Sequence, residues 1–290
     1  MATASSAHAD EHWRVDALTV SAADEATDRA DPAPRRRRHT ARLVRLVILP
    51  ATMLAIWQAA AMLELYNTVL LPPPSRVFMA AIGLIASGEL LRHFADSMRR
   101  IALANLVSIA TAVPLGVLMG RYRPFEEIMD GLLNILRPIP PLAWIPLAIL
   151  WFGLGESSVV FITLISAFFA ILINTIAGVR SVDRSLIRAA LTLGASQHDL
   201  IKDVVLPATL PHIITGVRIA LGVSWMSIVA AELIASSSGL GYMISYYREV
   251  LRSDLILVGM LTIGLIGFVM DRGLLWLERR LLPWCTRVEP

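Results

Sequence analysis

The chain has little of several residue types on which enzymes and small secreted proteins depend. It contains 1 cysteine, Cys285, which excludes an internal disulfide framework and most cysteine-based metal sites. The only lysine, Lys202, does not follow a glycine, so no phosphate-binding P-loop is present. No Gly-x-Ser-x-Gly motif occurs, and the 6 histidines form no dense cluster of ligands. We therefore expect no catalytic residue, no metal site and no cofactor bound by this chain itself.

Charged residues are also scarce. Only 17% of the 290 residues are charged, 56% are hydrophobic, and the mean hydropathy is +0.64. Such a chain is too apolar for an ordinary soluble domain and is typical of an all-α polytopic membrane protein in a lipid bilayer. The pI near 9.4 is compatible with a nucleic-acid partner. Because the arginines flank apolar segments instead of forming a basic soluble face, we expect no nucleic acid and assign them to membrane orientation.

Residues 1–41 lack a sustained apolar period and end in the basic run Arg35 to Arg38. This composition predicts a disordered tail without the apolar core of a signal peptide. The tail contains His8, Glu11 and His12 in the His-x-x-Glu-His spacing of inverted zinc proteases. Nothing around these residues would bury or shape a metal site, so we interpret them as part of a solvated tail.

Six apolar segments follow the tail, and each is long enough for a transmembrane helix. The third enters through prolines that free backbone carbonyls, so it belongs inside a bundle. It is preceded by a charged turn and surface helix over residues 121–137. The six predicted spans are residues 43–65, the stretch between Arg100 and Arg121, the segment entered through Pro138, Pro140, Pro141 and Pro146, the stretch between Glu156 and Arg180, and residues 211–234 and 255–277.

The basic residues predict which side of the membrane each connection occupies. With six spans, both termini lie on one side, together with residues 121–137 and the connection after Arg180. Most of the arginines and the single lysine fall on that side, although Arg99 and Arg100 precede a span on the other. Basic residues favour the cytoplasmic side, so we expect both termini to be cytoplasmic.

A polar helical hairpin is predicted between the fourth and fifth spans, from Arg188 to Gly216. Its first helix has one apolar stripe, because four residues recur at the spacing i, i+3, i+4 and i+7. Gly194 follows the last of them, where a left-handed helix stop favours glycine. A short helix with an apolar stripe must pack on its own protein or dock into a partner. The stripe consists of Leu186, Ala189, Ala190 and Leu193.

The second helix of the hairpin is predicted from the residues after the glycine. Ser196 and Asp199 have the spacing of an N-terminal cap. We expect Pro207 to end this helix and Pro211 to stand in the first turn of the next.

The hairpin resembles the EAA loop of ABC importer permeases, the segment on which those subunits dock their ATPase. The resemblance implies ATPase coupling for seven positions. One departs from the family pattern, since Arg188 replaces the usual acidic first residue, which puts the role of that carboxylate in doubt. The coupling positions are Arg188, Ala189, Ala190, Gly194, Ala195, Leu206 and Pro207, and Pro211 and Gly216 extend the match.

The resemblance covers residues 65–282 and is greatest for the sulfonate, taurine and nitrate branch of these permeases. The stretches LPPPSRV, LRPIPPLAWIPLAILWFGLGE, NTIAGVRSVD and SGLGYMI carry it. It implies a tail over 1–41, a first span and external connection over 42–88, a type I importer core over 89–275 and a cytoplasmic end over 276–290.

The same resemblance implies a function in import. The chain would be a permease subunit in a bacterial inner membrane, paired with a second copy, two ATP-binding cassette subunits that hold ATP and Mg²⁺, and an external solute-binding protein. The implied cargo is a small anion, an aliphatic sulfonate or taurine. The alternatives are nitrate, bicarbonate or a vitamin precursor.

Polar residues inside the spans leave a second class open, a membrane-embedded enzyme or a channel. Such residues mark functional sites more often than surface charges do. Each also has a structural interpretation. Asn174 and Arg218 would lie near the cytoplasmic interface and Glu232 near the outer one, and Asp271 would pair with Arg272 or with a neighbouring helix. For a permease, the candidate path residues are Asn174, Arg218, Ser224 and Glu232.

Overall fold

The computed structural model describes residues 35–281, and all regular elements in this range are helical. The residues His8, Glu11 and His12, interpreted above as part of a solvated tail, and Cys285 lie outside the described residues. The elements are α2 (Arg35–Met62), α3 (Pro74–Ala86), α4 (Glu89–Arg121), α5 (Arg123–Leu136), η1 (Pro141–Trp144), α6 (Ile145–Phe152), α7 (Glu156–Arg180), α8 (Arg184–Thr192), α9 (Gln197–Asp199), η2 (Leu200–Val205), α10 (Leu206–Ala235), α11 (Leu240–Glu249) and α12 (Ser253–Leu281).

The first unit of the chain ends at Ala59, and α2 supplies its described part. The helix begins at Arg35, before the boundary expected at residue 42, and continues through Pro50. Its apolar part, Ile48–Met62, exposes Ile48, Leu49 and Met53 by more than half. Exposed apolar side chains along a helix suit contact with lipid.

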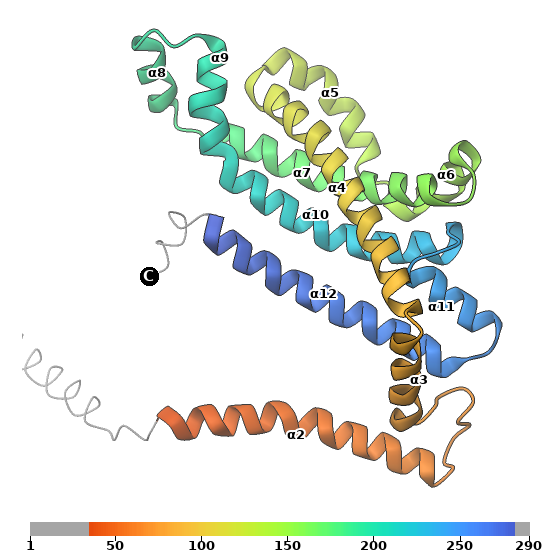
Figure 1. Cartoon of the computed structure of the whole chain (residues 1–290). Helices are drawn as coiled ribbons and strands as arrows, with labels where there is room; N and C mark the ends of the chain where they lie inside the picture. Colours follow the sequence, from red (N-terminus) through yellow and green to blue (C-terminus); the bar gives the residue numbers. More distant parts are fainter. Residues whose placement is uncertain (1–34, 282–290) are drawn as a thin grey trace, which may run out of the picture. The chain divides into compact units, whose positions relative to one another are not determined.

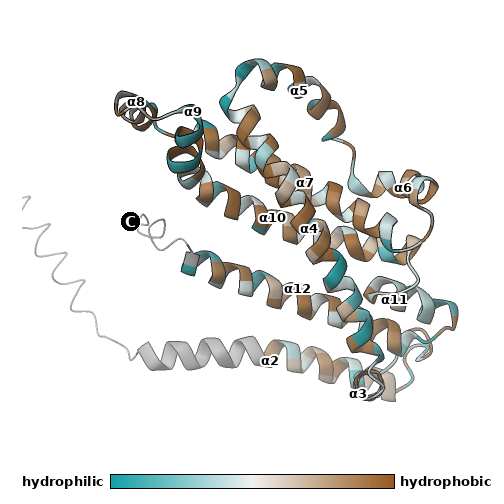
Figure 2. Ribbon diagram, turned by 45° about the horizontal axis from the view of Figure 1, so that its top comes forward, coloured by the Kyte–Doolittle hydropathy of each residue, from teal (hydrophilic) through white to brown (hydrophobic). Residues whose placement is uncertain are grey.

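The second unit, Ala60–Pro290, contains the long helices α4, α7, α10 and α12. These four are long and apolar enough to cross a membrane. They run beside one another, and hydrophobic residues dominate their middle parts (Figures 1 and 2). Helix α7 packs against both α4 and α10. The all-helical fold predicted from the sequence is confirmed.

The third predicted span differs from expectation. Helix α6 has only 8 residues, about 12 Å of rise, and cannot cross a hydrocarbon core of about 30 Å. Helix α5, predicted as a surface helix, forms a bent pair with η1 and α6, with an angle of 84°. Arg99 near the start of α4 contacts Glu156 at 2.6 Å, whereas Arg121 at the other end contacts Gln197 at 3.0 Å. The segment between Arg121 and Glu156 therefore runs along α4 from Arg121 to the level of Arg99, and this bent pair of helices is called the broken span below.

The predicted count of six spans is not confirmed. The described residues contain four helices of sufficient length and hydropathy, or five when the bent pair is counted as one span. The predicted span 43–65 falls in α2, where the apolar part Ile48–Met62 is shorter than those four.

Helices α7 and α10 approach closely because each places a glycine against the other. A methyl group at Gly178 of α7 would lie 2.6 Å from Cβ of His212 on α10. One at Gly216 of α10 would lie 2.8 Å from Cβ of Asn174 on α7. Small residues at helix contacts let backbones approach without a hydrophobic driving force, as membrane helices require. This reciprocal contact holds the hairpin end of α10 against α7.

Several buried hydroxyl groups along the spans are satisfied within their own helices, although Thr209 Oγ1 has no hydrogen-bond partner among the described residues. Ser108 donates to the carbonyl of Ala104 at 2.8 Å, and Thr163 to that of Val159 at 2.7 Å. Thr175 does the same toward Ile171 at 2.8 Å. In lipid an unsatisfied hydroxyl costs several kcal/mol, so these internal bonds make the polar residues tolerable inside an apolar bundle.

Candidate functional site

The hairpin corner has the geometry that its sequence predicts. Gly194 has φ +86°, in the left-handed region. Its N–H donates to the carbonyl of Leu191 at 3.0 Å, and the N–H of Ala195 donates to the carbonyl of Ala190 at 3.1 Å. These two bonds make up a Schellman motif, which satisfies the last carbonyls of α8. The predicted helix stop at Gly194 is confirmed.

Side chains cap both helices of the hairpin. Ser196 Oγ accepts from the N–H of Asp199 at 3.2 Å, and Asp199 Oδ2 accepts from the N–H of Ser196 at 3.1 Å, so the predicted cap is a reciprocal capping box. Asp183 Oδ1 accepts from the N–H of Ser185 at 2.7 Å at the start of α8. This backbone hydrogen bond lowers the pKa of the Asp183 carboxyl. The caps hold the hairpin in one conformation.

The second hairpin helix does not end at Pro207, contrary to the sequence prediction. The chain is helical without a break from Gln197 to Ala235. A π-helical segment, Leu200–Val205, directly precedes α10, and Pro207 stands where the hydrogen-bond register changes from π to α. Pro211 lies inside α10 and not in its first turn. The second hairpin helix and the fifth predicted span are thus one continuous helix.

Three of the four residues of the predicted apolar stripe face outward, and Ala190 faces inward. Leu186 is 53% exposed, Leu193 is 88% exposed, and Ala189 is exposed as well. The inner face of α8 carries Ile187 and Ala190, which pack on a buried cluster at the base of the hairpin. The stripe is therefore free to contact another molecule. The cluster consists of Val117, Val179, Val182, Leu200 and Val205.

The other predicted coupling residues lie on both faces of the hairpin. Arg188 and Pro207 are exposed, and Leu206 is 38% exposed. Ala190 and Ala195 are half-buried. The exposed members share the hairpin surface with Leu186 and Leu193.

A second polar site lies at the opposite end of the bundle, where Arg100 of α4 and Glu232 of α10 form a buried ion pair. Their side chains are 4% and 0% exposed, with Arg100 NH1 2.8 Å from Glu232 Oε1. Ser97 Oγ donates to the same carboxylate at 2.8 Å. Arg100 also donates to the carbonyl and hydroxyl of Ser238, at 2.8 and 2.7 Å.

The ion pair and its neighbours cap the N-terminus of α11. The first amides of a helix have no partner within it, and a negative charge there is stabilising. Here the N–H of Gly241 donates to Glu232 Oε2 at 3.0 Å, and that of Leu240 to Ser97 Oγ at 3.0 Å. Gly239, at φ +104°, approaches Glu232 so closely that a methyl group would overlap the carboxylate. The buried carboxylate therefore fixes where α11 begins.

The structure does not bring the four predicted path residues together. Arg218 donates to Glu278 of α12 at 2.6 Å, and Ser224 accepts from Asn105 of α4 at 3.3 Å. Asn174 donates to the carbonyl of Ala170 at 2.8 Å. Glu232, the fourth candidate, pairs with Arg100. Each candidate is therefore bonded to a residue of its own helix or of a neighbouring helix. Their role in a path remains a prediction.

Sequence reasoning missed the partners of Glu232. Arg100 was counted only as a charge at the outer start of a span, and Ser97 was not considered. The available signal was that opposite charges stand at matching ends of two predicted spans, since Arg100 begins the second and Glu232 ends the fifth. Asp271, another candidate, is exposed, and Arg272 lies over the Phe268 ring at 5.2 Å.

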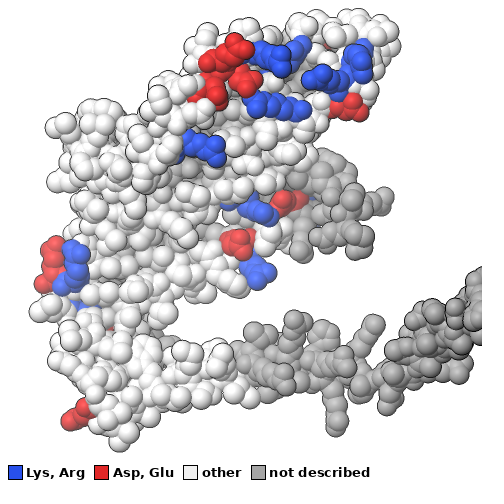
Figure 3. Space-filling model, turned by 180° about the vertical axis from the view of Figure 1, so that it is seen from behind, with Lys and Arg blue, Asp and Glu red and all other residues white. Residues whose placement is uncertain are grey.

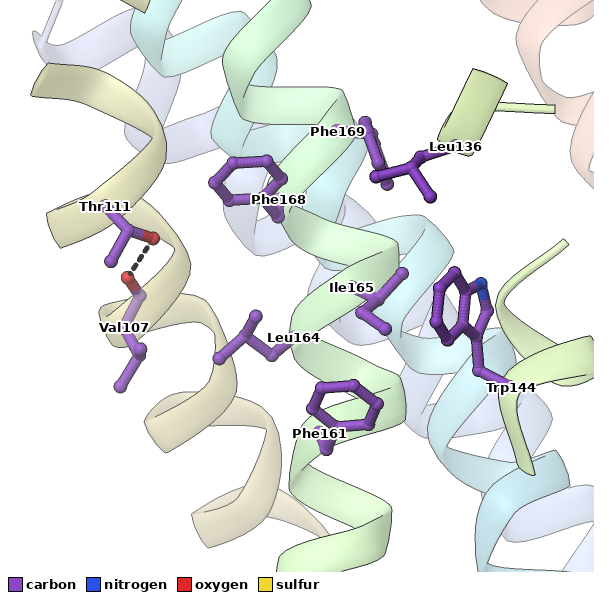
Figure 4. A pocket seen from close by; sticks show the side chains of 9 residues that line it. All are labelled: Val107, Thr111, Leu136, Trp144, Phe161, Leu164, Ile165, Phe168 and Phe169. Atoms are coloured by element: carbon purple, nitrogen blue, oxygen red, sulfur yellow. Dashed lines mark hydrogen bonds between the residues drawn. The ribbon is translucent and has the colours of Figure 1, made fainter. Parts of the chain in front are cut away.

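An apolar recess of about 370 Å³ lies between α4, α7 and the broken span. Three phenylalanine rings line it, and its one hydroxyl, on Thr111, donates to the carbonyl of Val107 at 2.8 Å (Figure 4). The other side-chain polar atom of the lining is Trp144 Nε1, which is buried and has no hydrogen-bond partner among the described residues. The rest of the lining is apolar, so the recess suits apolar side chains or lipid. Its lining is Val107, Thr111, Leu136, Trp144, Phe161, Leu164, Ile165, Phe168 and Phe169.

Charged side chains gather toward the two ends of the helices, with a largely uncharged surface between them (Figure 3). Between residues 35 and 281, no group of three or more histidine, cysteine, aspartate or glutamate side chains is placed to hold a metal ion. The structure thus offers a capped, outward-facing hairpin at one end and a buried ion pair at the other.

The sequence was compared with known families and proteins. Residues 112–283 match the family described as the binding-protein-dependent transport system inner membrane component. The chain belongs to this family. It is therefore a membrane-embedded permease of an ABC transporter and a transport subunit, not an enzyme. The resemblance seen in the sequence is confirmed.

Individual relatives extend the match over most of the permease. An ABC transporter permease protein of Methanocaldococcus jannaschii is 46% identical over 251 residues, which are 85% of this chain and 94% of the relative. The taurine transport system permease protein of Escherichia coli is 39% identical over 244 residues, 82% of this chain and 89% of the relative.

The fold is also similar to that of a solved structure. A chain of the MetNI methionine ABC transporter, in an inward-facing conformation, aligns with a TM-score of 0.53 at 20% identity. The alignment covers 65% of this chain and 96% of that chain. At this identity the likeness concerns the fold alone.

Proposed function

We propose that the permease forms a homodimer in a bacterial inner membrane and imports a small anion with two ATPase subunits and an external solute-binding protein. ATP and Mg²⁺ are bound by the ATPase subunits. Both termini and the hairpin α8–α9 face the cytoplasm. The observation that carries the proposal is the exposed stripe of Leu186, Ala189 and Leu193 on a hairpin capped at every end.

The hairpin is suited to receive an ATPase because it is rigid and its apolar side chains are outside. A leucine that is 88% exposed in the permease gains about 1.5–3 kcal/mol when a partner buries it. Since α9 continues into α10, a push on the hairpin is transmitted directly to a membrane helix. Movement of docked ATPases would then open the path alternately to each side.

The second copy is placed against the apolar recess of Figure 4. Its phenylalanine-rich surface is almost wholly apolar, with the Thr111 hydroxyl bonded to Val107 and Trp144 Nε1 buried, so a neighbouring helix covers it at little desolvation cost. Asn174, Arg218, Ser224 and Glu232 remain the candidate path residues.

The proposed cargo is taurine or another aliphatic sulfonate. Support comes from the E. coli relative named for taurine transport, with 39% identity over most of both chains. Nitrate, bicarbonate or a vitamin precursor is the alternative. Selectivity is assigned largely to the binding protein.

The docking proposal is tested with Leu193→Glu in the reconstituted complex. A loss of about 1.5–3 kcal/mol corresponds to about a 10- to 150-fold weaker association with the ATPase subunits. Leu154→Glu is the matched control, because Leu154 is 75% exposed but lies between α6 and α7, at the other end. Equal ATPase association for wild type and the Leu193 variant would refute docking at this surface.

The cargo is tested by uptake into proteoliposomes that contain permease, ATPase and binding protein. We expect ATP-dependent uptake of radiolabelled taurine that disappears when either added protein is omitted. Nitrate uptake without taurine uptake would favour the alternative cargo, and uptake by the permease alone would contradict an ATP-driven mechanism.

A further inference from the structure

A basic cavity of about 580 Å³ lies at the base of the hairpin, between the end of α4, α5, the end of α7, α8 and η2. The volume is within the range of small-ligand sites, about 300–1,000 Å³. Unlike the recess of Figure 4, this cavity has a mainly polar lining. Its residues are Gly120, Arg121, Arg123, Glu126, Val179, Arg180, Val182, Arg184, Ile187 and Val205.

The charge of the lining is strongly positive. Four arginines and one glutamate line the cavity, so the net formal charge of its lining side chains is +3. Glu126 forms an ion pair with Arg180 and is not available to the others. Arg123 and Arg184 are exposed, and neither guanidinium group has a hydrogen bond or ion pair with any residue from 35 to 281. Asp183, beside Arg184, is engaged in capping α8. The cavity thus holds more cationic groups than the described chain neutralises.

Arg121 lines the cavity and is partly satisfied by its neighbours. Its NH2 group donates to Gln197 Oε1 at 3.0 Å, and its guanidinium lies 5.6 Å from the Tyr122 ring. Its Nε atom is buried without a hydrogen-bond partner within the described residues and exposes almost no surface to the cavity. An anionic oxygen in the cavity would therefore bind this guanidinium through its terminal nitrogens.

The position of the cavity indicates what kind of anion it holds. It lies where the membrane helices α4 and α7 end and the polar hairpin begins, the depth of lipid headgroups. Basic pockets between membrane helices at this depth bind the phosphates of anionic lipids. Guanidinium groups match phosphate oxygens in geometry and charge.

We propose that this cavity binds a phosphate group, supplied by the headgroup of an anionic phospholipid. The bound phosphate bridges Arg184 of the hairpin helix α8 with Arg121 and Arg123 at the end of the bundle. The lipid thereby holds the hairpin against the membrane helices. The site is distinct from the outward-facing stripe of α8, because Ile187, on the inner face, lines the cavity.

The test is native mass spectrometry of the purified full-length permease, titrated with phosphatidylglycerol, phosphatidylcholine or inorganic phosphate. We expect tighter binding of phosphatidylglycerol than of phosphatidylcholine. The double variant Arg123→Gln/Arg184→Gln should weaken phosphatidylglycerol binding by about 30-fold, from about 1 kcal/mol for each arginine. Both side chains are exposed, so folding is preserved.

The control is Arg92→Gln/Arg248→Gln, which removes two exposed arginines from the opposite end of the helices. Unchanged phosphatidylglycerol binding in this control supports a specific site. Competition by millimolar inorganic phosphate identifies a free phosphate as the ligand of the same site. Equal lipid binding by wild type and the Arg123/Arg184 variant, or an equal loss in the control, would overturn the proposal. The readout needs no ATPase, so it is independent of the proposed import function.

Discussion

The buried pair of Glu232 and Arg100 gives a prediction that separates a structural role from a role in transport. In Glu232→Gln, the amide keeps the shape of the carboxylate but loses its charge. Arg100, 4% exposed, is then a buried cation without a counter-charge. One oxygen is also replaced by an NH₂ group. Whichever way the amide turns, this donor faces either the N–H of Gly241 or the guanidinium of Arg100, two groups that are themselves donors.

The expected cost is large. Removing one partner of a buried ion pair costs about 3–5 kcal/mol, because the remaining charge is uncompensated. For a domain of about 150–250 residues, each kcal/mol lowers the midpoint of thermal unfolding by about 2–4 °C. We therefore expect Glu232→Gln to lower the midpoint by about 6–20 °C, with the loss concentrated at the start of α11.

The assay is thermal unfolding of the detergent-purified permease, together with a double-mutant cycle. Arg100→Met alone should destabilise by a similar amount, since it leaves a buried carboxylate. The double variant Glu232→Gln/Arg100→Met leaves no buried charge and should be clearly more stable than the sum of the single effects implies. Strict additivity, with a shift below about 1 °C for Glu232→Gln, would refute the structural role. Normal stability combined with lost transport would instead favour Glu232 as a path residue.

Three other perturbations test separate parts of the molecule. Gly194→Val places a β-branched residue at φ +86° and should cost about 1–3 kcal/mol at the corner, so we expect weaker stimulation of the ATPase with normal membrane insertion. Ala195→Gly is the milder control. Full ATPase stimulation in the valine variant would contradict the role of the corner. A reporter fused after Pro290 should be cytoplasmic, and one inserted at Leu251, 76% exposed between α11 and α12, should be external; opposite labelling would reject the topology. Gly178→Val should overpack the contact of α7 with α10, at a cost of about 1–3 kcal/mol, and lower the thermal midpoint by about 2–12 °C, whereas an unchanged midpoint would show that the helices can separate.

The hairpin could be predicted in detail because its signals are local. Gly194, Ser196 and Asp199 act through bonds to residues a few positions away, so their pattern alone indicates the corner and the cap. The sequence could not predict which face of α8 packs inward. Ile187 and Ala190 face inward because they pack against a buried cluster to which four other segments of the chain contribute.

The errors at the prolines have a different cause. Pro207 was expected to end a helix, but the π-helical turn before it shifts the hydrogen-bond register, and propensity alone does not predict that turn. The broken span was missed because the surface helix α5 and the proline-rich segment after it look separate in sequence. Their joint role follows from contacts at the two ends of α4, which only the fold brings together.

Helices α9, η2 and α10 form one continuous rod. From Gln197 to Gly216 and from Gly216 to Ala235 the chain runs 19 residues each way, so each arm is about 28 Å long at 1.5 Å per residue. The glycine contact with α7 stands at the middle. If the segment tilts as a rigid rod about this contact, its two ends move by similar distances in opposite directions. The end away from the hairpin carries Glu232, and with it the start of α11.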